Sequence, residues 1–221
     1  MSFMPELDNL SLDELIVRFR GTATGHEDEE QVYYDEVAYR MPERHGEKGL
    51  VFLLEELERV RDDEIRLGAV LDGLWLLPPH HPLGTQTNLF YLDHSNDLIV
   101  MTAIDGLKHL ETTEAHDRVL AHLAHPSQYV VGAVLRYMSR LFREEALPIL
   151  LEALRDERYI VRECAVDELD EMDIPTVADA APYVRPLLGD PHPHVRSAAR
   201  WYFAHLAGLL EPDEDEPDEE L

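Results

Sequence analysis

Residues 145–169 read EALPILLEALRDERYIVRECAVDEL, and residues 183–206 read YVRPLLGDPHPHVRSAARWYFAHL. In both segments a leucine-containing stretch is followed by an aspartate, then by a valine and arginine pair, and then by an alanine four residues after the valine. The two alanines, Ala165 and Ala199, are 34 residues apart. Self-similarity at a period of this length is typical of arrays of helical repeats.

The same spacing continues toward the N-terminus, where an apolar residue again precedes an alanine by four positions at intervals of 30 to 34 residues. A small alanine at a fixed phase lets neighbouring helices approach closely, while larger residues one turn later fill the layer between repeats. The six pairs are Tyr34/Ala38, Ile65/Ala69, Ile99/Ala103, Tyr129/Ala133, Val161/Ala165 and Val195/Ala199.

A second set of amphipathic stretches lies between these segments, so each period is expected to hold two helices. No stretch shows the sustained alternation that is typical of β-strands. The sequence therefore predicts an all-α solenoid of about six helix pairs. The additional stretches are 11–20, 48–60, 86–94, 114–124, 144–155 and 177–188.

The repeats predict a single domain over residues 1–210, because adjacent repeats share their cores. Residues 211–221, EPDEDEPDEEL, are almost entirely acidic or proline and are expected to form a disordered tail. The segment from Leu77 to Gln86, LPPHHPLGTQ, is expected to be a long turn and a second candidate docking surface.

The two quoted segments resemble HEAT repeats, with a proline in the first helix (Pro148, Pro186) and a D-x4-V-R turn. The resemblance is strongest over 144–206 and extends to 48–77. It implies that the turn aspartates and arginines form a polar ladder along the stack. The ladder residues would be Asp156, Arg162, Asp190 and Arg196, with Arg66 beside Asp62 and Asp63 as a third rung, whereas Asp35, Val100 and Val130 occupy the arginine position in the other repeats.

The chain carries 19 Lys and Arg against 46 Asp and Glu, a formal net charge of −27 at pH 7. A surface of this sign repels phosphate, so nucleic acid is not expected as a partner. Alkylpurine DNA glycosylases of the HEAT-like type need a basic concave surface, and that function is excluded for the same reason. Three interpretations of the acidity remain: attraction of a basic partner, imitation of DNA, or a proteome-wide bias that favours solubility.

The composition also indicates the cellular compartment in which the protein is expected. A single cysteine, Cys164, excludes a disulfide framework and any multi-thiolate metal site, and its helical position predicts a buried, inert thiol. The first twenty residues lack the basic and apolar regions of a signal peptide, and no run approaches the roughly 20 apolar residues that span a bilayer. We therefore expect a cytoplasmic protein with no membrane partner.

Catalytic chemistry finds little support in the sequence. Deoxyhypusine hydroxylase, which is similar in architecture, holds iron on repeated His-Glu pairs, whereas this chain has only His26-Glu27. The clusters His80/His81 and His192/His194 are expected to be turn histidines, and whether they bind a metal stays open. No nucleophile elbow, phosphate loop or H-E-x-x-H motif occurs. We therefore predict no catalytic residue, no cofactor and no metal ligand.

HEAT-like repeats also occur in bilin lyases of phycobilisomes, and that enzyme class is kept as an alternative. Its tetrapyrrole would need a cleft lined by aromatic residues. The helical phase of the aromatic residues instead favours packing in the core. These residues are Tyr33, Tyr34, Trp75, Tyr137, Trp201 and Tyr202.

Solenoids usually bind partners on the side formed by their second helices. Polar residues two to six positions after each anchor alanine are expected on that side, and most are acidic. We expect them to attract a basic protein partner, with an affinity that weakens as salt screens the charges. The predicted protein-binding residues are Asp72, Asp105, Arg136, Asp167, Glu168, Asp170 and Glu171, with Arg40 and Ser139 on the same stripe.

The sequence thus predicts a non-catalytic binding protein. It would serve as an adaptor or scaffold, or as an immunity or inhibitor protein that neutralises a basic, nuclease-like toxin. The alternatives are an enzyme or accessory of the bilin-lyase type and an acidic inhibitor that imitates DNA.

Overall fold

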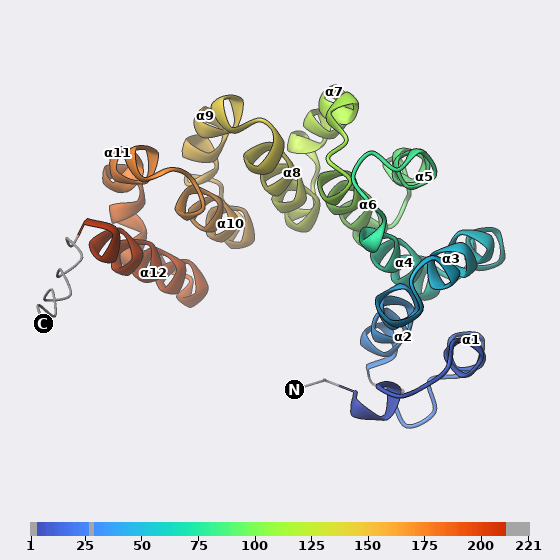
Figure 1. Ribbon diagram of the computed structural model, residues 1–221. Helices are drawn as coiled ribbons and strands as arrows, with labels where there is room; N and C mark the ends of the chain where they lie inside the picture. Colours follow the sequence, from blue (N-terminus) through green and yellow to red (C-terminus); the bar gives the residue numbers. More distant parts are fainter. Residues whose placement is uncertain (1–3, 27–28, 211–221) are drawn as a thin grey trace, which may run out of the picture. The chain divides into compact units, whose positions relative to one another are not determined.

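The computed structural model describes residues 4–26 and 29–210, and the predicted acidic tail at 211–221 lies outside them (Figure 1). Every regular element in these ranges is an α-helix or a short 3₁₀-helix, which confirms the all-α prediction. The chain divides into two compact units, Met1–Tyr137 and Met138–Leu221. Each unit is described by itself.

Unit 1 contains alternating first and second helices, and the second helices α2, α4 and α6 pack in succession (Figure 1). The first helices are α1 (Leu12–Arg20), α3 (Glu47–Val60), α5 (Pro82–Tyr91) and α7 (His116–Leu120), and the second helices are α2 (Glu30–His45), α4 (Glu64–Gly73), α6 (Asp97–His109) and most of α8 (Gln128–Leu141). Short 3₁₀-helices occur at η1 (Pro5–Leu7), η3 (Leu74–Leu76), η4 (Thr113–Ala115) and η5 (Ala121–Ala124).

Unit 2 repeats this order. Helices α9 and α11 are first helices, and α10 packs against α12 as the next second helix (Figure 1). Pro148 lies inside α9 as the repeat pattern requires, whereas Pro186 falls in the 3₁₀-helix η6 that follows α11. The elements are α9 (Arg143–Ala153), α10 (Tyr159–Asp170), α11 (Ile174–Val184), η6 (Arg185–Gly189) and α12 (Pro193–Leu210).

The anchor alanines confirm the predicted register. All six have no exposed surface, so each lies where one helix contacts its neighbours. Aromatic side chains around them are also fully buried, including Tyr34, Tyr137 and Tyr202. The six positions are Ala38, Ala69, Ala103, Ala133, Ala165 and Ala199.

At Gly49, helices α2 and α3 approach each other so closely that no side chain larger than hydrogen fits between them. A Cβ atom added to Gly49 would lie 2.3 Å from the Met41 carbonyl oxygen. The two helices are joined by Gly46 alone, at φ 56°, a conformation that glycine adopts at little cost. Glycine at these two positions therefore sets the geometry of the α2–α3 pair.

One rung of the predicted polar ladder is present. The Arg162 guanidinium donates from Nε to Asp190 Oδ2 at 2.8 Å and from Nη2 to Oδ1 at 2.9 Å. Its Nη1 donates to the backbone carbonyls of Asp156 and Glu157, and Arg196 Nη1 likewise donates to the Asp190 carbonyl. These contacts join the α9–α10 and α11–α12 turns through a mostly buried ion pair.

The other predicted rungs do not form ion pairs between successive turns in the described part of the chain. The Asp156 carboxylate accepts hydrogen bonds from Arg158 and does not pair with Arg162. Arg66 pairs with Asp63, donates from Nε to the Phe19 carbonyl at 2.8 Å and lies 4.2 Å over the Tyr34 ring. Arg66 thus caps the end of α1.

The expected long turn at Leu77–Gln86 is shorter than predicted. Helix α5 already begins at Pro82, whose fixed φ suits the first turn of a helix. His81 is the N-cap, and its Nδ1 accepts a hydrogen bond from the Gly84 amide. Only residues 77–81 form a connection, so this loop offers little docking surface.

A carboxylate at a buried anchor should break the stack. We expect Ala199→Glu to lower the free energy of unfolding by more than about 3 kcal/mol, because the charge would have neither water nor a partner. Ala204, exposed on the same helix, is the control: Ala204→Glu should change stability by less than about 0.5 kcal/mol. Urea unfolding followed by circular dichroism measures both, and equal stabilities of the two variants would contradict the register.

Candidate functional site

Acidic side chains recur on the second helices of unit 1. They include Asp35 on α2, Asp72 on α4 and Asp105 on α6. The charges of Asp35 and Asp105 are close enough to raise the pKa of Asp72. Asp105 is 5% exposed and already paired: Arg136 donates to it from Nε at 3.0 Å and from Nη2 at 2.6 Å, and Lys108 Nζ lies 3.1 Å away. The structure thus brings Asp105 and Arg136 together as an internal ion pair, so neither presents an uncompensated charge to a partner.

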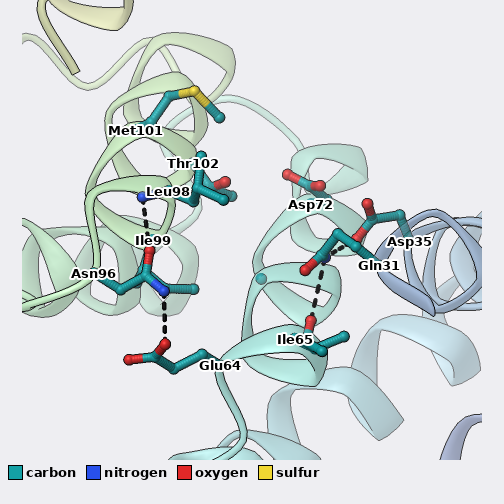
Figure 2. Close-up of a pocket in the computed structure, with 11 residues that line it drawn as sticks. Gln31, Asp35, Glu64, Ile65, Asp72, Asn96, Leu98, Ile99, Met101 and Thr102 are labelled. Carbon is teal, nitrogen blue, oxygen red and sulfur yellow. Dashed lines mark hydrogen bonds between the residues drawn. The ribbon is translucent and has the colours of Figure 1, made fainter. Parts of the chain in front are cut away.

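Asp72, in contrast, lines an open pocket between α2, α4 and α6. The pocket has a volume of about 240 Å³, and Figure 2 shows Asp35 and Asp72 on one side of it and Thr102 of α6 on the other. Its apolar walls come from Ile65 on α4 and from three residues of α6. The lining residues are Gln31, Asp35, Glu64, Ile65, Gly68, Asp72, Asn96, Leu98, Ile99, Met101 and Thr102.

Several polar groups in the pocket already have partners. Gln31 Nε2 donates to Asp35 Oδ1 at 2.7 Å and to the Ile65 carbonyl at 3.3 Å. Asn96 Nδ2 donates to Glu64 Oε2 at 2.6 Å (Figure 2). These contacts fix two of the three carboxylates in place while leaving one oxygen of each available.

Two polar groups in the pocket have no partner within the described ranges. The Asp72 carboxylate accepts no hydrogen bond and forms no ion pair there, although it is partly buried. The Thr102 hydroxyl also has no hydrogen-bond partner in that part of the chain, although the residue is only 6% exposed. No Lys, Arg or His side chain lines the pocket. The pocket is therefore rich in acceptors and lacks a positive charge.

This arrangement raises the pKa of both aspartates. Burial, followed by the nearby charges of Asp35 and Asp105, raises the pKa of Asp72 to about 8. Burial raises the pKa of Asp35 to about 6, although the hydrogen bond from Gln31 lowers it and Glu36 adds to the rise. A cation entering the pocket would favour the charged form of both carboxylates.

Unit 2 carries the other predicted residues on α10. Glu168 accepts a hydrogen bond from the Ser139 hydroxyl, and Asp170 Oδ1 lies 2.9 Å from His205 Nδ1. Glu171 is exposed at the C-cap of the helix. Asp167 has no such partner among the described residues. Although the residue is exposed, partial desolvation of its carboxylate together with four neighbouring carboxylates raises its pKa to about 6.

Asp167 lines a second hollow, between α10 and α12. This hollow has a volume of about 390 Å³ and also contains Glu163, His194 and Trp201. Trp201 is 72% exposed, so its expected place in the core is wrong. The reason is its phase on α12: the neighbouring Tyr202 takes the buried position and turns Trp201 outward.

Sequence reasoning missed the residues that complete the pocket of unit 1. In the sequence Asp35 stands out only as a replacement of the ladder arginine, and Glu64 and Thr102 carry no signal of their own. Asp35 offered one clue, since an acid at a position that holds arginine in other repeats reverses the local charge. Predicted residue Arg40 is buried and pairs with Glu36 and Asp8.

No group of three or more metal-ligating side chains that could hold an ion occurs among residues 4–26 and 29–210. His81 caps α5, and the His192 ring stacks on Tyr159 with 3.5 Å between ring centroids. No helix in the described part of the chain is long and apolar enough to cross a membrane.

Comparisons with known proteins agree with this architecture. A family model described as HEAT repeats matches residues 85–170. No curated protein matches the chain.

Two solved structures share the fold. The crystal structure of an engineered protein is similar with a TM-score of 0.53 and 10% identity, covering 89% of this chain and 96% of that chain. A designed armadillo repeat protein in complex with the peptide (KR)4 is similar with a TM-score of 0.50 and 13% identity, covering 89% of this chain and all of that chain.

Replacing Asp72 should change how stability depends on pH. Because the pKa of Asp72 in the folded protein lies above its ordinary value of 3.8, the unfolded chain releases this proton first, and stability is lost progressively as pH rises from about 4 to about 8. We expect Asp72→Asn to raise the free energy of unfolding at pH 8.5 by at least about 1.4 kcal/mol, with a smaller gain at pH 5.

Urea unfolding at the two pH values measures this gain. Glu47→Gln, an exposed position on α3, is the control and should show no such dependence. A gain that is the same at pH 5 and pH 8.5 would contradict the assigned pKa of Asp72.

Proposed function

We propose that the protein is a non-catalytic binding protein that recognises a basic protein segment through the acidic side of its second helices. The match of residues 85–170 to the family model described as HEAT repeats supports this proposal. Solenoids of the HEAT and armadillo type typically bind proteins or peptides along one face. Such a protein would act as an adaptor or scaffold, or as an inhibitor of a basic enzyme such as a nuclease, and both roles use the same surface.

The single observation that carries this proposal is the uncompensated acid in the pocket of unit 1. Asp35, Glu64 and Asp72 line one cavity that contains no basic side chain. Bringing carboxylates together in a partly buried site is unfavourable unless a positive charge accompanies them. A lysine or arginine side chain of a partner would supply that charge, since its aliphatic stem would contact Ile65 and Ile99 while its head reached the carboxylates.

Unit 2 supports the same function independently. Asp167 and Glu163 lie beside the exposed ring of Trp201. An aromatic face attracts cations, and the neighbouring carboxylates add to that attraction. The hollow between α10 and α12 therefore also favours a basic side chain.

The armadillo repeat protein that shares the fold provides a further argument. That protein forms a complex with an alternating Lys-Arg peptide. At 13% identity the likeness concerns the fold, so the argument for a basic ligand here rests on this chain's own carboxylates. The bilin-lyase alternative has less support, because Tyr33, Tyr34, Tyr137 and Tyr202 are buried in the core and cannot line a cleft.

A basic peptide should bind in a way that depends on salt and on the pocket. We expect a fluorescein-labelled (KR)4 peptide to bind the full chain at low salt and to bind at least about 10-fold more weakly in 0.5 M NaCl, because exposed charges are screened over a few ångströms there. The double variant Asp35→Asn/Asp72→Asn should weaken binding by about 10-fold at low salt. Fluorescence anisotropy measures both effects.

The matched control is Glu47→Gln/Glu55→Gln, which removes two charges from exposed positions on the first helix α3. This control should weaken binding by less than about 2-fold, because charges on the far side of a helix pair interact with the ligand only through solvent. Absence of peptide binding to the wild-type chain at low salt would refute the proposed function.

A further inference from the structure

The free polar atoms of the unit 1 pocket define the kind of group that fits it. Asp72 offers two carboxylate oxygens, Asp35 offers Oδ2, Glu64 offers Oε1 and Thr102 offers its hydroxyl oxygen. When the carboxylates are ionised all of these are acceptors, and only the Thr102 hydroxyl can then also donate. A complementary ligand must therefore carry several donors and a positive charge.

The donors would need to reach acceptors on three helices. Asp35 belongs to α2, Asp72 to α4 and Thr102 to α6, and Figure 2 shows them around one space. A guanidinium group is planar and carries five N–H donors that point outward in fixed directions, whereas an ammonium carries three donors around one atom. Arginine is also more weakly hydrated than lysine, so its transfer into a partly buried pocket costs less free energy.

The remaining walls suit the stem of the same side chain. Ile65 of α4 and Leu98, Ile99 and Met101 of α6 line the pocket, and these apolar groups can cover three methylene groups. A divalent metal ion fits less well, since calcium takes six to eight oxygen ligands and magnesium a regular octahedron. The described side chains form no cluster of that kind.

We propose that this pocket is a subsite for one arginine side chain of the partner, with the guanidinium bridging Asp35 and Asp72 and donating to the Thr102 hydroxyl. The inference rests on the proposed function in that it names the residue that the basic segment would place here. Thr102 is then a specificity-determining residue, because its hydroxyl lies across the pocket from the carboxylates and completes the set of acceptors.

Proton release should accompany binding. The charged groups around Asp72 are Asp35 with its neighbour Glu36 on α2, Glu64 on α4, and Asp105 on α6 with its partners Lys108 and Arg136. Apart from the pair on Asp105, these groups are acidic. An arginine would displace the proton that Asp72 holds near neutral pH, so affinity should increase between pH 6 and pH 8.5.

The test compares three peptides on the full chain by isothermal titration calorimetry: (AR)4, (AK)4 and the same peptide with neutral citrulline in place of arginine. We expect (AR)4 to bind about 5- to 10-fold more tightly than (AK)4, and the citrulline peptide to show no binding. Thr102→Val should weaken (AR)4 about 5-fold and reduce the preference for arginine over lysine. Asp72→Asn should weaken (AR)4 at least about 10-fold and remove the increase in affinity between pH 6 and pH 8.5.

The control variant is Thr87→Val, the same replacement at a partly buried position of the first helix α5. It should leave the affinity for (AR)4 and the preference for arginine unchanged. Equal affinities of (AR)4 and (AK)4 for the wild-type chain, or equal effects of Thr102→Val and Thr87→Val, would overturn the arginine subsite.

These outcomes separate the subsite from the proposed function. If both basic peptides bind and weaken with salt but are insensitive to Asp72→Asn and Thr102→Val, the subsite is wrong and recognition of basic segments stands. If neither peptide binds, the proposed function fails. The subsite is then tested with agmatine, whose guanidinium should shift the methyl resonances of Ile65 and Ile99 in NMR spectra, and unchanged resonances would overturn it.

Discussion

The structure depends on the close contact of successive helices at buried alanines. A helix pair in such an array cannot bury its apolar face alone, so its stability comes from the neighbouring repeats. Because Ala69 and Ala103 are fully buried, α4 and α6 lie near each other and residues about one turn beyond the alanines face the open side. The position of Asp72 three residues after Ala69 follows from this constraint, and so does the pocket that it lines.

The charge pattern on this side separates structural pairs from binding groups. Asp105 is neutralised by Arg136 and Lys108, and the pair joins α6 to α8 within unit 1. Asp72 lies one repeat earlier, on α4, and has no basic neighbour in the pocket. Two aspartates at nearly the same repeat phase therefore differ in their contacts, since one holds helices together and the other is the group that we propose binds the basic segment. Net charge alone could not make this distinction.

Much of the fold was predictable from the sequence, because the spacing of apolar and small residues reports directly on which helix faces are buried. The alanine register and the Arg162–Asp190 pair are confirmed. The error at Trp201 arose because two adjacent aromatic residues share one helical segment and only one of them can face the core. The pocket was not predictable, since Asp35 and Thr102 come from different repeats and meet only through tertiary packing.

The central claim is that a basic segment binds to the second helices of unit 1, at the pocket between α2, α4 and α6. Hydrogen–deuterium exchange of the full chain with and without saturating (KR)4 peptide tests this claim most directly, since it maps the contact without any substitution. The account predicts slower exchange in α4 (Glu64–Gly73) and α6 (Asp97–His109), with little change in the first helices α3 and α5. Slower exchange confined to α3 and α5, with α4 and α6 unchanged, would contradict it.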